Sequence, residues 1–350
     1  MTTGFGIAFP GQGTKAAALT AALHAHHRHA LVARLLDTFD AADPDALDLT
    51  DTAVNQPATC AVGIAAVEAA FGPAARPPVT VGHSLGELTA AACAGFLDAH
   101  DAFDLAVARG ALCRAQNLRR PGAMVAVVGA GPADVEWLRR RVLAERGGIL
   151  EIAGLNSARQ VVLSGDPAAV RETVRLAAEL CLRAEPLPIA GGFHSPLMMD
   201  AVPLWRSRLE AVDFRPGTAR FVSAIDAREH TDPEQVRERL AQGLVLPVRW
   251  REAMHAVRDL GVPGLIDAGP GDTLLRLGRR DRSTPFVGIG EPAARPTAPE
   301  RARPRRSPQS PAHPRTQSRT PLGHDHRTDR SPDPSRPDTP IRRRRSGGVT

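Results

Sequence analysis

The sequence predicts an α/β protein whose core is interrupted by a small second domain. Short apolar runs alternate with segments of helical spacing on both sides of residues 122–189. Within residues 122–189 the order becomes strand, helix, strand, strand, helix, strand, which is the split arrangement of a ferredoxin-like domain. We therefore expect one core from residues 1–121 and 190–290, with a ferredoxin-like (βαββαβ) subdomain at 122–189.

The elements of the core follow from apolar runs and helical spacing. Residues 5–13 read as a buried strand that ends in the turn Pro-Gly-Gln-Gly. Asn55 or Gln56, followed by Pro57, is typical of the start of a buried helix reaching Phe71. The other expected elements are helices at about 15–39, 86–98, 101–116, 191–212, 232–243 and 247–261, and strands at 78–84, 219–225 and within 263–274.

The small domain needs four strands and two helices. Asp166 followed by Pro167 marks the start of its second helix. The expected strands lie at 123–130, 147–156, 160–166 and 181–190, and the expected helices at 131–145 and 167–180.

The positive charge of the chain is concentrated in its last part. Residues 291–350 hold 14 Arg, six Asp or Glu and 12 of the 31 prolines, which gives this segment a net charge of +8. The whole chain carries +6, so residues 1–290 sum to −2. A segment with so few large apolar residues cannot offset its ordering entropy, and we expect a disordered tail. Its "RRRR" run could contact an acidic partner, but we interpret the tail as a solvated extension and expect no nucleic-acid partner.

Several classes of protein are not indicated. No apolar run reaches the roughly 18 to 20 residues that cross a bilayer, and no signal-peptide pattern opens the chain, so we expect a cytoplasmic protein without a membrane partner. The four cysteines form no C-x-x-C pair, which argues against a zinc site or a disulfide framework. The histidines between His24 and His29 have no accompanying carboxylate or cysteine cluster, so a solvated helix face is expected there and no metal.

The pentapeptide Gly82-His83-Ser84-Leu85-Gly86 is the candidate for chemistry. A G-x-S-x-G sequence between a strand and a helix places the serine on a sharp turn, with its Oγ above the edge of the sheet. The amide of Leu85 and the helix N-terminus then face the same space and suit an oxyanion. The context predicts that Ser84 is a nucleophile.

A nucleophilic serine needs a base, and His194 is the best candidate. It lies in "GGFHSP", where the chain returns from the small domain to the core. His83 is adjacent to Ser84, and neighbouring side chains on a tight turn point apart. His100, His230 and His255 have no glycine-rich surroundings.

Eight short motifs then occur in a fixed order between residues 5 and 277. Together they resemble the malonyl-CoA:acyl-carrier-protein transacylase family, which includes the acyltransferase domains of polyketide synthases. The motifs are "FPGQG", "QPA", "GHSLGE", "ARG", "NSARQVVLSG", "FHSPLM", "PVRW" and "DAGPG".

The resemblance implies an α/β-hydrolase-like core with an inserted ferredoxin-like subdomain, and it implies roles for individual residues. By similarity, Ser84 accepts the acyl group, His194 is its base, and the amides of Gln12 and Leu85 form the oxyanion hole. Arg109 would bind the free carboxylate of a malonyl group. Further pocket positions matched by the motifs are Gln56, Asn156 and Phe193, the last in the form seen in malonyl-selective members.

One position departs from the family pattern. The family has a glutamine a few residues before "PV-W", and its main-chain carbonyl orients the catalytic histidine. Here Gln242 lies one residue further from Pro247, with Gly243 in the aligned place. Either residue could supply that carbonyl.

The resemblance implies a function without a metal or redox cofactor. A malonyl group would pass from malonyl-CoA to Ser84, and then to the phosphopantetheine thiol of an acyl carrier protein, for fatty acid or polyketide synthesis. A monomer is expected. Two alternatives stay open: a hydrolase that edits acyl groups on carrier proteins, and the malonyl transferase of a malonate decarboxylase system.

Overall fold

The computed structural model describes residues 4–281 and 283–291, which lie in one compact unit, Met1–Glu300. The core is built on a six-stranded sheet in the order β10-β9-β1-β2-β7-β8. All neighbours in this sheet are parallel except β7 and β8. Its strands are β1 (Gly6–Phe9), β2 (Val79–Gly82), β7 (Arg220–Ser223), β8 (Arg228–His230), β9 (Leu265–Asp267) and β10 (Phe286–Gly288).

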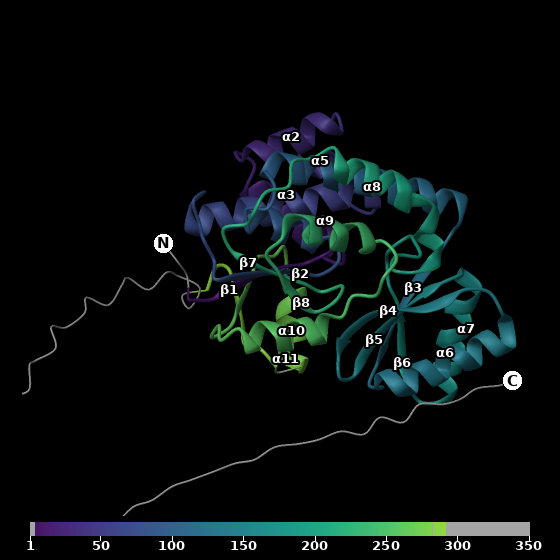
Figure 1. The fold of residues 1–350 in the computed structure, drawn as a ribbon. Coiled ribbons are helices and arrows are strands. Elements are labelled where there is room, and N and C mark those ends of the chain that lie inside the picture. Colours follow the sequence, from purple (N-terminus) through teal and green to yellow (C-terminus); the bar gives the residue numbers. More distant parts are fainter. Residues whose placement is uncertain (1–3, 282, 292–350) are drawn as a thin grey trace, which may run out of the picture. The chain divides into compact units, whose positions relative to one another are not determined.

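Helices cover both faces of this sheet, as expected for strands made of continuous apolar runs (Figure 1). On one side, a first core joins the sheet to α1 (Ala16–Ala25), α2 (Ala30–Thr38), α3 (Thr52–Phe71), α4 (Gly86–Cys93), α5 (Ala99–Arg119), α8 (Val202–Glu210) and α9 (Pro233–Gln242). The other face packs on α10 (Trp250–Asp259) and α11 (Thr273–Asp281). Successive side chains of β1 point to opposite faces of the sheet, so Ile7 and Phe9 belong to the first core and Ala8 belongs to the second.

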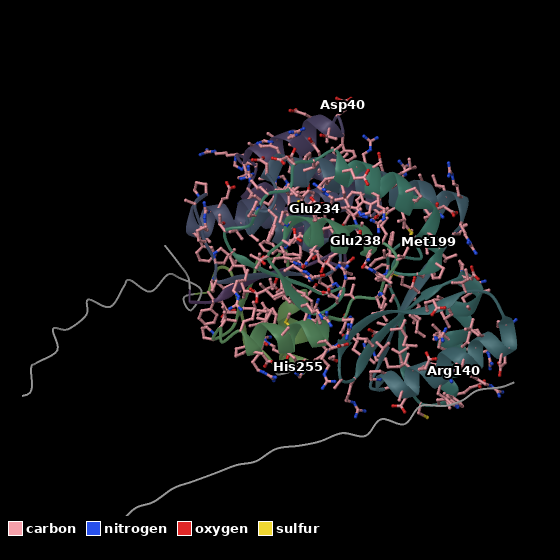
Figure 2. The ribbon with its side chains drawn as sticks, viewed as in Figure 1. Asp40, Arg140, Met199, Glu234, Glu238 and His255 are labelled. Carbon is pink, nitrogen blue, oxygen red and sulfur yellow. The ribbon has the colours of Figure 1, made fainter. Side chains whose placement is uncertain are left out.

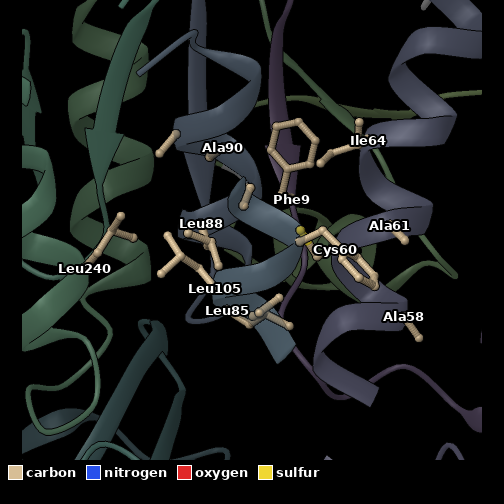
Figure 3. Packing of buried hydrophobic residues seen from close by; sticks show 14 of the residues in the cluster. Phe9, Ala58, Cys60, Ala61, Ile64, Leu85, Leu88, Ala90, Leu105 and Leu240 are labelled. Carbon is tan, nitrogen blue, oxygen red and sulfur yellow. The ribbon is translucent and has the colours of Figure 1, made fainter. Parts of the chain in front are cut away.

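The first core brings α3 and α4 against the end of β1. Figure 3 shows how small side chains of α3 allow this packing. The labelled residues are Ala58, Cys60, Ala61 and Ile64 of α3, Phe9 of β1, and Leu85, Leu88, Ala90, Leu105 and Leu240 from the surrounding elements.

The small sheet has the order β4-β5-β3-β6, and every neighbouring pair is antiparallel. Its elements follow the predicted order: β3 (Ala123–Val128), α6 (Pro132–Arg146), β4 (Leu150–Ser157), β5 (Gln160–Gly165), α7 (Pro167–Glu179) and β6 (Arg183–Pro186). The two helices pack on one face of this sheet, on the side away from the core (Figure 1). Met124, Ala126 and Val162 on the other face belong to the first core. The helix-free face of the small sheet is therefore one wall of the space between the two sheets.

Several predicted boundaries are wrong. Helix α3 begins at Thr52 because Asp51 Oδ1 accepts the amide of Ala53, so Pro57 lies inside the helix and not at its start. The single helix expected at 15–39 is two helices, and the side chain of His29 caps the second. Strands β8 and β10 were not predicted, and the helix expected from 191 is a 3-10 helix (Pro196–Ala201) followed by α8.

Two further predictions concern the tail and the membrane. The tail expected at 291–350 lies outside the described residues, apart from Glu291. Within the described ranges, no helix is long and apolar enough to span a membrane.

The turn between β2 and α4 fits tightly against the end of β1. A Cβ placed on Gly86 would lie 2.1 Å from the carbonyl oxygen of Phe9, which is main chain and cannot move aside cheaply. The glycine therefore permits the close approach of these two segments.

Substituting Gly86→Ala should lower the free energy of unfolding by about 3 kcal/mol, because the added methyl group must displace backbone. Gly13→Ala is the matched control, since nothing lies within 4 Å of its added Cβ. Chemical denaturation of the three proteins measures the difference. Equal stabilities for both variants would contradict the tight fit.

Candidate active site

The strand-to-helix turn carries Ser84 in the left-handed region of the backbone. Its φ is 55°, and the φ of His194 is 59°. Such angles are uncommon for residues other than glycine and persist where the surrounding structure enforces them. Here the amide of His83 donates to the carbonyl of Phe9 at 2.9 Å, which anchors the turn to β1.

Ser84 and His194 lie within hydrogen-bond distance although 110 residues separate them. Ser84 Oγ is 2.7 Å from His194 Nε2, and His194 Nδ1 is 2.9 Å from the carbonyl oxygen of Leu246. A carbonyl only accepts, so Nδ1 carries the proton and donates to Leu246. Nε2 is then free to accept the proton of Ser84, as a general base must.

The residue that orients the histidine was predicted wrongly as Gln242 or Gly243. The carbonyl that accepts from His194 Nδ1 belongs to Leu246. The carbonyl of Gln242 instead accepts the amides of Val245 and Leu246, and so closes the turn that presents Leu246. The shifted position of Gln242 therefore does not affect His194, because the carbonyl of Leu246 accepts its hydrogen bond.

Burial holds His194 in its neutral form. Loss of solvent, together with the nearby positive charge of Arg109, lowers the pKa of His194 from 6.5 to about 3. The group is therefore a neutral proton acceptor throughout the neutral pH range. Between these two pKa values the unfolded chain binds a proton that the folded chain does not, so this group costs stability as pH falls below 6.5.

Two main-chain amides are available beside Ser84. Neither the amide of Leu85 nor that of Gln12 has a hydrogen-bond partner among residues 4–281 and 283–291. Leu85 directly precedes α4, so its amide lies at the positive end of that helix. Gln12 belongs to the loop after β1 and lines the same cleft as Ser84.

Arg109 is a buried cation, on which the charge of the buried Glu87 acts without a salt bridge. Its side chain is 6% exposed, and one Nη donates to Gln56 Oε1 at 2.6 Å. No carboxylate in the described part of the chain pairs with it, and burial lowers the pKa of its guanidinium. An unpaired buried charge is costly, so its remaining donors favour an anionic ligand.

The cleft between the two sheets contains most of the predicted residues. Gln12, Ser84, Asn156, Phe193 and His194 all line it. Leu85, Gln56 and Arg109 are buried next to it and do not line the cleft itself. Apolar side chains of the small sheet and of α11 form the remaining walls, including Met124, Val162, Leu274 and Leu277.

Two cleft residues were missed or dismissed at the sequence level. His83 Nε2 lies 2.9 Å from Asn156 Oδ1, and its ring packs on Trp250 with centroids 5.2 Å apart. Through Asn156, His83 connects the turn that carries Ser84 to the small sheet. Gln160 also lines the cleft, and its buried Oε1 has no partner among the described residues. Its place in the "NSARQ" motif was the only signal in the sequence.

Glu87, the last residue of the "GHSLGE" motif, is buried beneath the turn. It accepts hydrogen bonds from Ser223 Oγ at 2.8 Å and from the amide of Ala224, and burial raises its pKa to about 7. This carboxyl ties the first turn of α4 to the end of β7.

Three other described histidines, which were weighed as bases in the sequence, make their contacts away from Ser84. His100 contacts Arg34, His230 pairs with Asp226, and His255 lies at the outer edge of α10 (Figure 2). In the described ranges, no group of three or more His, Cys, Asp or Glu could hold a metal ion.

Comparison with known proteins agrees with this geometry. A family model described as acyl transferase domain matches residues 7–284. The chain belongs to the acyl transferase domain family. The malonyl CoA-acyl carrier protein transacylase of Bacillus subtilis (strain 168) is 31% identical over 296 residues, covering 81% of this chain and 92% of the relative.

Solved structures of acyl transferases are similar over the same range. An acyl-carrier-protein S-malonyltransferase from Burkholderia pseudomallei 1710b has a TM-score of 0.74 at 29% identity, covering 83% of this chain and 97% of that one. A malonyl-transacylase solved in complex with its type II PKS acyl-carrier protein has a TM-score of 0.71 at 28% identity, covering 81% and 94%. The mixed α/β fold is therefore that of this acyl transferase family.

The low pKa of His194 predicts how the reactivity of Ser84 depends on pH. The rate at which a fluorophosphonate labels Ser84 should change little between pH 7 and pH 5, because His194 stays neutral in that interval. For a histidine with its ordinary pKa, the neutral fraction would fall by more than about twentyfold over this range.

Labelling rates followed by intact-protein mass spectrometry test this prediction, with Ser84→Ala as the unlabelled control. An inflection near pH 6.5 with a loss of that size would contradict it.

Proposed function

We propose that this chain transfers a malonyl group from malonyl-CoA to the phosphopantetheine thiol of an acyl carrier protein, in fatty acid or polyketide synthesis. The observation that carries the proposal is the hydrogen-bonded pair Ser84 and His194 beside Arg109, a buried cation that no described carboxylate neutralises. Relatives about 30% identical over most of the chain, named as malonyl transferases, support the same reaction.

The reaction proceeds as two transfers through a malonyl-serine ester. His194 Nε2 takes the hydroxyl proton as Ser84 Oγ attacks the thioester carbonyl, and the C–S bond then breaks as the CoA sulfur receives that proton. In the second half, the carrier thiol gives its proton to His194 and its sulfur attacks the ester. Ser84 Oγ leaves with the proton, which restores the enzyme.

The amides of Gln12 and Leu85 stabilise the two tetrahedral intermediates. Both amides lack partners among the described residues; Leu85 follows Ser84 in the chain, and Gln12 lines the same cleft as Ser84. Donors fixed before the reaction need no reorganisation as negative charge develops on the carbonyl oxygen. This arrangement supports their assignment as the oxyanion hole.

Arg109 selects the substrate. Its free donors can bind the malonyl carboxylate in bidentate fashion, and the ion pair offsets the cost of the buried charge. An uncharged acyl group leaves that cost in place. The cation thus favours a dicarboxylic thioester over the substrates of an ordinary esterase.

The remaining assignments concern the walls of the site and the fold. Phe193 crowds a 2-methyl branch, and Asn156, held by His83, contributes to the pocket. The sheet order β4-β5-β3-β6 supports a ferredoxin-like subdomain at 122–189 inserted in an α/β-hydrolase-like core at 1–121 and 190–290. The reaction that we propose uses no cofactor and no nucleic acid, and it requires only one copy of the chain.

The decisive experiment is intact-protein mass spectrometry after mixing with malonyl-CoA, and then with a holo acyl carrier protein. We expect a malonyl adduct on Ser84 that moves to the carrier, and no adduct on Ser84→Ala because the nucleophile is missing. Release of free malonate without carrier loading would favour the editing hydrolase. Carrier loading by Ser84→Ala would refute the assignment.

Replacing Arg109 with alanine should lower kcat/KM for malonyl-CoA by about a hundredfold, since a buried charge pair is lost. Acetyl transfer should fall far less. Arg119→Ala is the control, because Arg119 is an exposed arginine on the same helix. Equal losses for malonyl-CoA and acetyl-CoA would show that Arg109 does not read the carboxylate.

A further inference from the structure

Four side chains form a continuous chain of hydrogen bonds from Arg109 to Gln12, in the loop after β1. Arg109 Nη1 lies 2.6 Å from Gln56 Oε1, and Gln56 Nε2 lies 2.9 Å from Thr52 Oγ1. Thr52 Oγ1 lies 2.7 Å from Gln12 Oε1. The chain joins α5, the start of α3 and the loop after β1.

The chemistry of the groups fixes the direction of the bonds that Gln56 makes, and the placed atoms give the direction of the bond from Thr52 to Gln12. A guanidinium can only donate, so Gln56 must turn its Oε1 to Arg109 and its Nε2 to Thr52. The hydroxyl of Thr52 accepts that bond and gives its one proton to Gln12 Oε1. Since Arg109 cannot lose its proton at neutral pH, the Gln56 amide cannot flip without placing its NH2 group against the guanidinium.

Close packing of α3 on α5 makes this chain possible. A Cβ on Gly110 would lie 2.9 Å from the carbonyl oxygen of Thr52 and 3.0 Å from the Cα of Ala53. The glycine after Arg109 therefore lets α5 approach α3 closely enough for the arginine to reach Gln56. Thr52, Gln56 and Arg109 are all buried, so little water is available to replace a lost link.

We propose that Thr52 is a positioning residue for the transfer reaction. Its hydroxyl holds the side chain of Gln12, and through it the main-chain amide that faces the oxyanion. The same hydroxyl connects this amide to Arg109, so the carboxylate subsite and the oxyanion hole are fixed by one set of bonds. This inference rests on the proposed function for its substrate, but the bonding pattern does not.

The test replaces Thr52 with valine, which keeps the shape of the side chain and removes the hydroxyl. We expect kcat for malonyl transfer to fall about tenfold, because a bond that orders the oxyanion donor is lost. Thr52→Ser should restore the rate. Thr59→Val removes another buried hydroxyl from α3, one that bonds Asn55, and should leave the rate unchanged.

A double-mutant cycle separates positioning from general damage to the fold. If Thr52 acts on the oxyanion hole through the Gln12 side chain, Thr52→Val should not slow labelling of Ser84 by a fluorophosphonate any further in a Gln12→Ala background, because that reagent has no carboxylate for Arg109 to bind. A tenfold loss that persists in that background would overturn the inference, and so would a Thr52→Val rate equal to the wild type. Thermal unfolding of each variant identifies any that fails to fold, and Thr52→Ser then decides the question.

Labelling of Ser84 by a fluorophosphonate makes the outcome independent of the malonyl substrate. The phosphonylation step also develops negative charge in the oxyanion hole, so Thr52→Val should slow it by a similar factor. If the wild-type chain labels normally but transfers no malonyl group, the proposed function fails while this inference is still tested. If Thr52→Val labels as fast as the wild type, the inference fails and the proposed function stands.

Discussion

The position of His194, which we propose as the base, depends on one short segment that is bonded in two directions. The carbonyls of Leu244 and Leu246 accept the amide and Nδ1 of His194. Two residues later, Val248 exchanges main-chain hydrogen bonds with Ala153 and Leu155 of the small sheet. The segment therefore holds the histidine and the small sheet in one register. A displacement of the small sheet relative to the core would also displace His194 from Ser84.

This coupling explains why the site lies between two sheets and not on one of them. The core supplies Ser84, the free amides of Gln12 and Leu85, and the guanidinium of Arg109. The small sheet supplies the opposite wall with the face that its own helices leave uncovered. His83 joins the two parts a second time through Asn156. The apolar lining limits water near the ester, which favours transfer to a thiol over hydrolysis.

The sequence predicted best what is encoded locally. The turn around Ser84 could be read because Gly82 and Gly86 are needed there for close approach, and the order of strands and helices followed from apolar periodicity. His194 could be found from its unusual surroundings and from the motif that contains it.

The start of α3 was misplaced because the cap at Asp51 outweighed the familiar signal of Pro57. Leu246 could not be predicted as the orienting residue, since a main-chain carbonyl places no demand on the side chain that accompanies it. The residue types of Thr52 and Gln160 do not indicate a function in the sequence, and only their contacts in the structure place them at the site.

The charge of Arg109 acts on the base as well as on the substrate. In the unliganded site, burial and this cation hold the pKa of His194 near 3, which makes the histidine a weak proton acceptor. General-base catalysis is most efficient when the pKa of the base lies near the working pH. A carboxylate bound to Arg109 offsets the positive charge that disfavours the imidazolium, so the basicity of His194 rises when the substrate carries a second carboxyl group. An uncharged acyl group gives no such compensation, and it meets a weaker base as well as an unpaired cation. In the role that we propose for Arg109, the guanidinium favours a dicarboxylic substrate both by binding its carboxylate and by raising the basicity of His194.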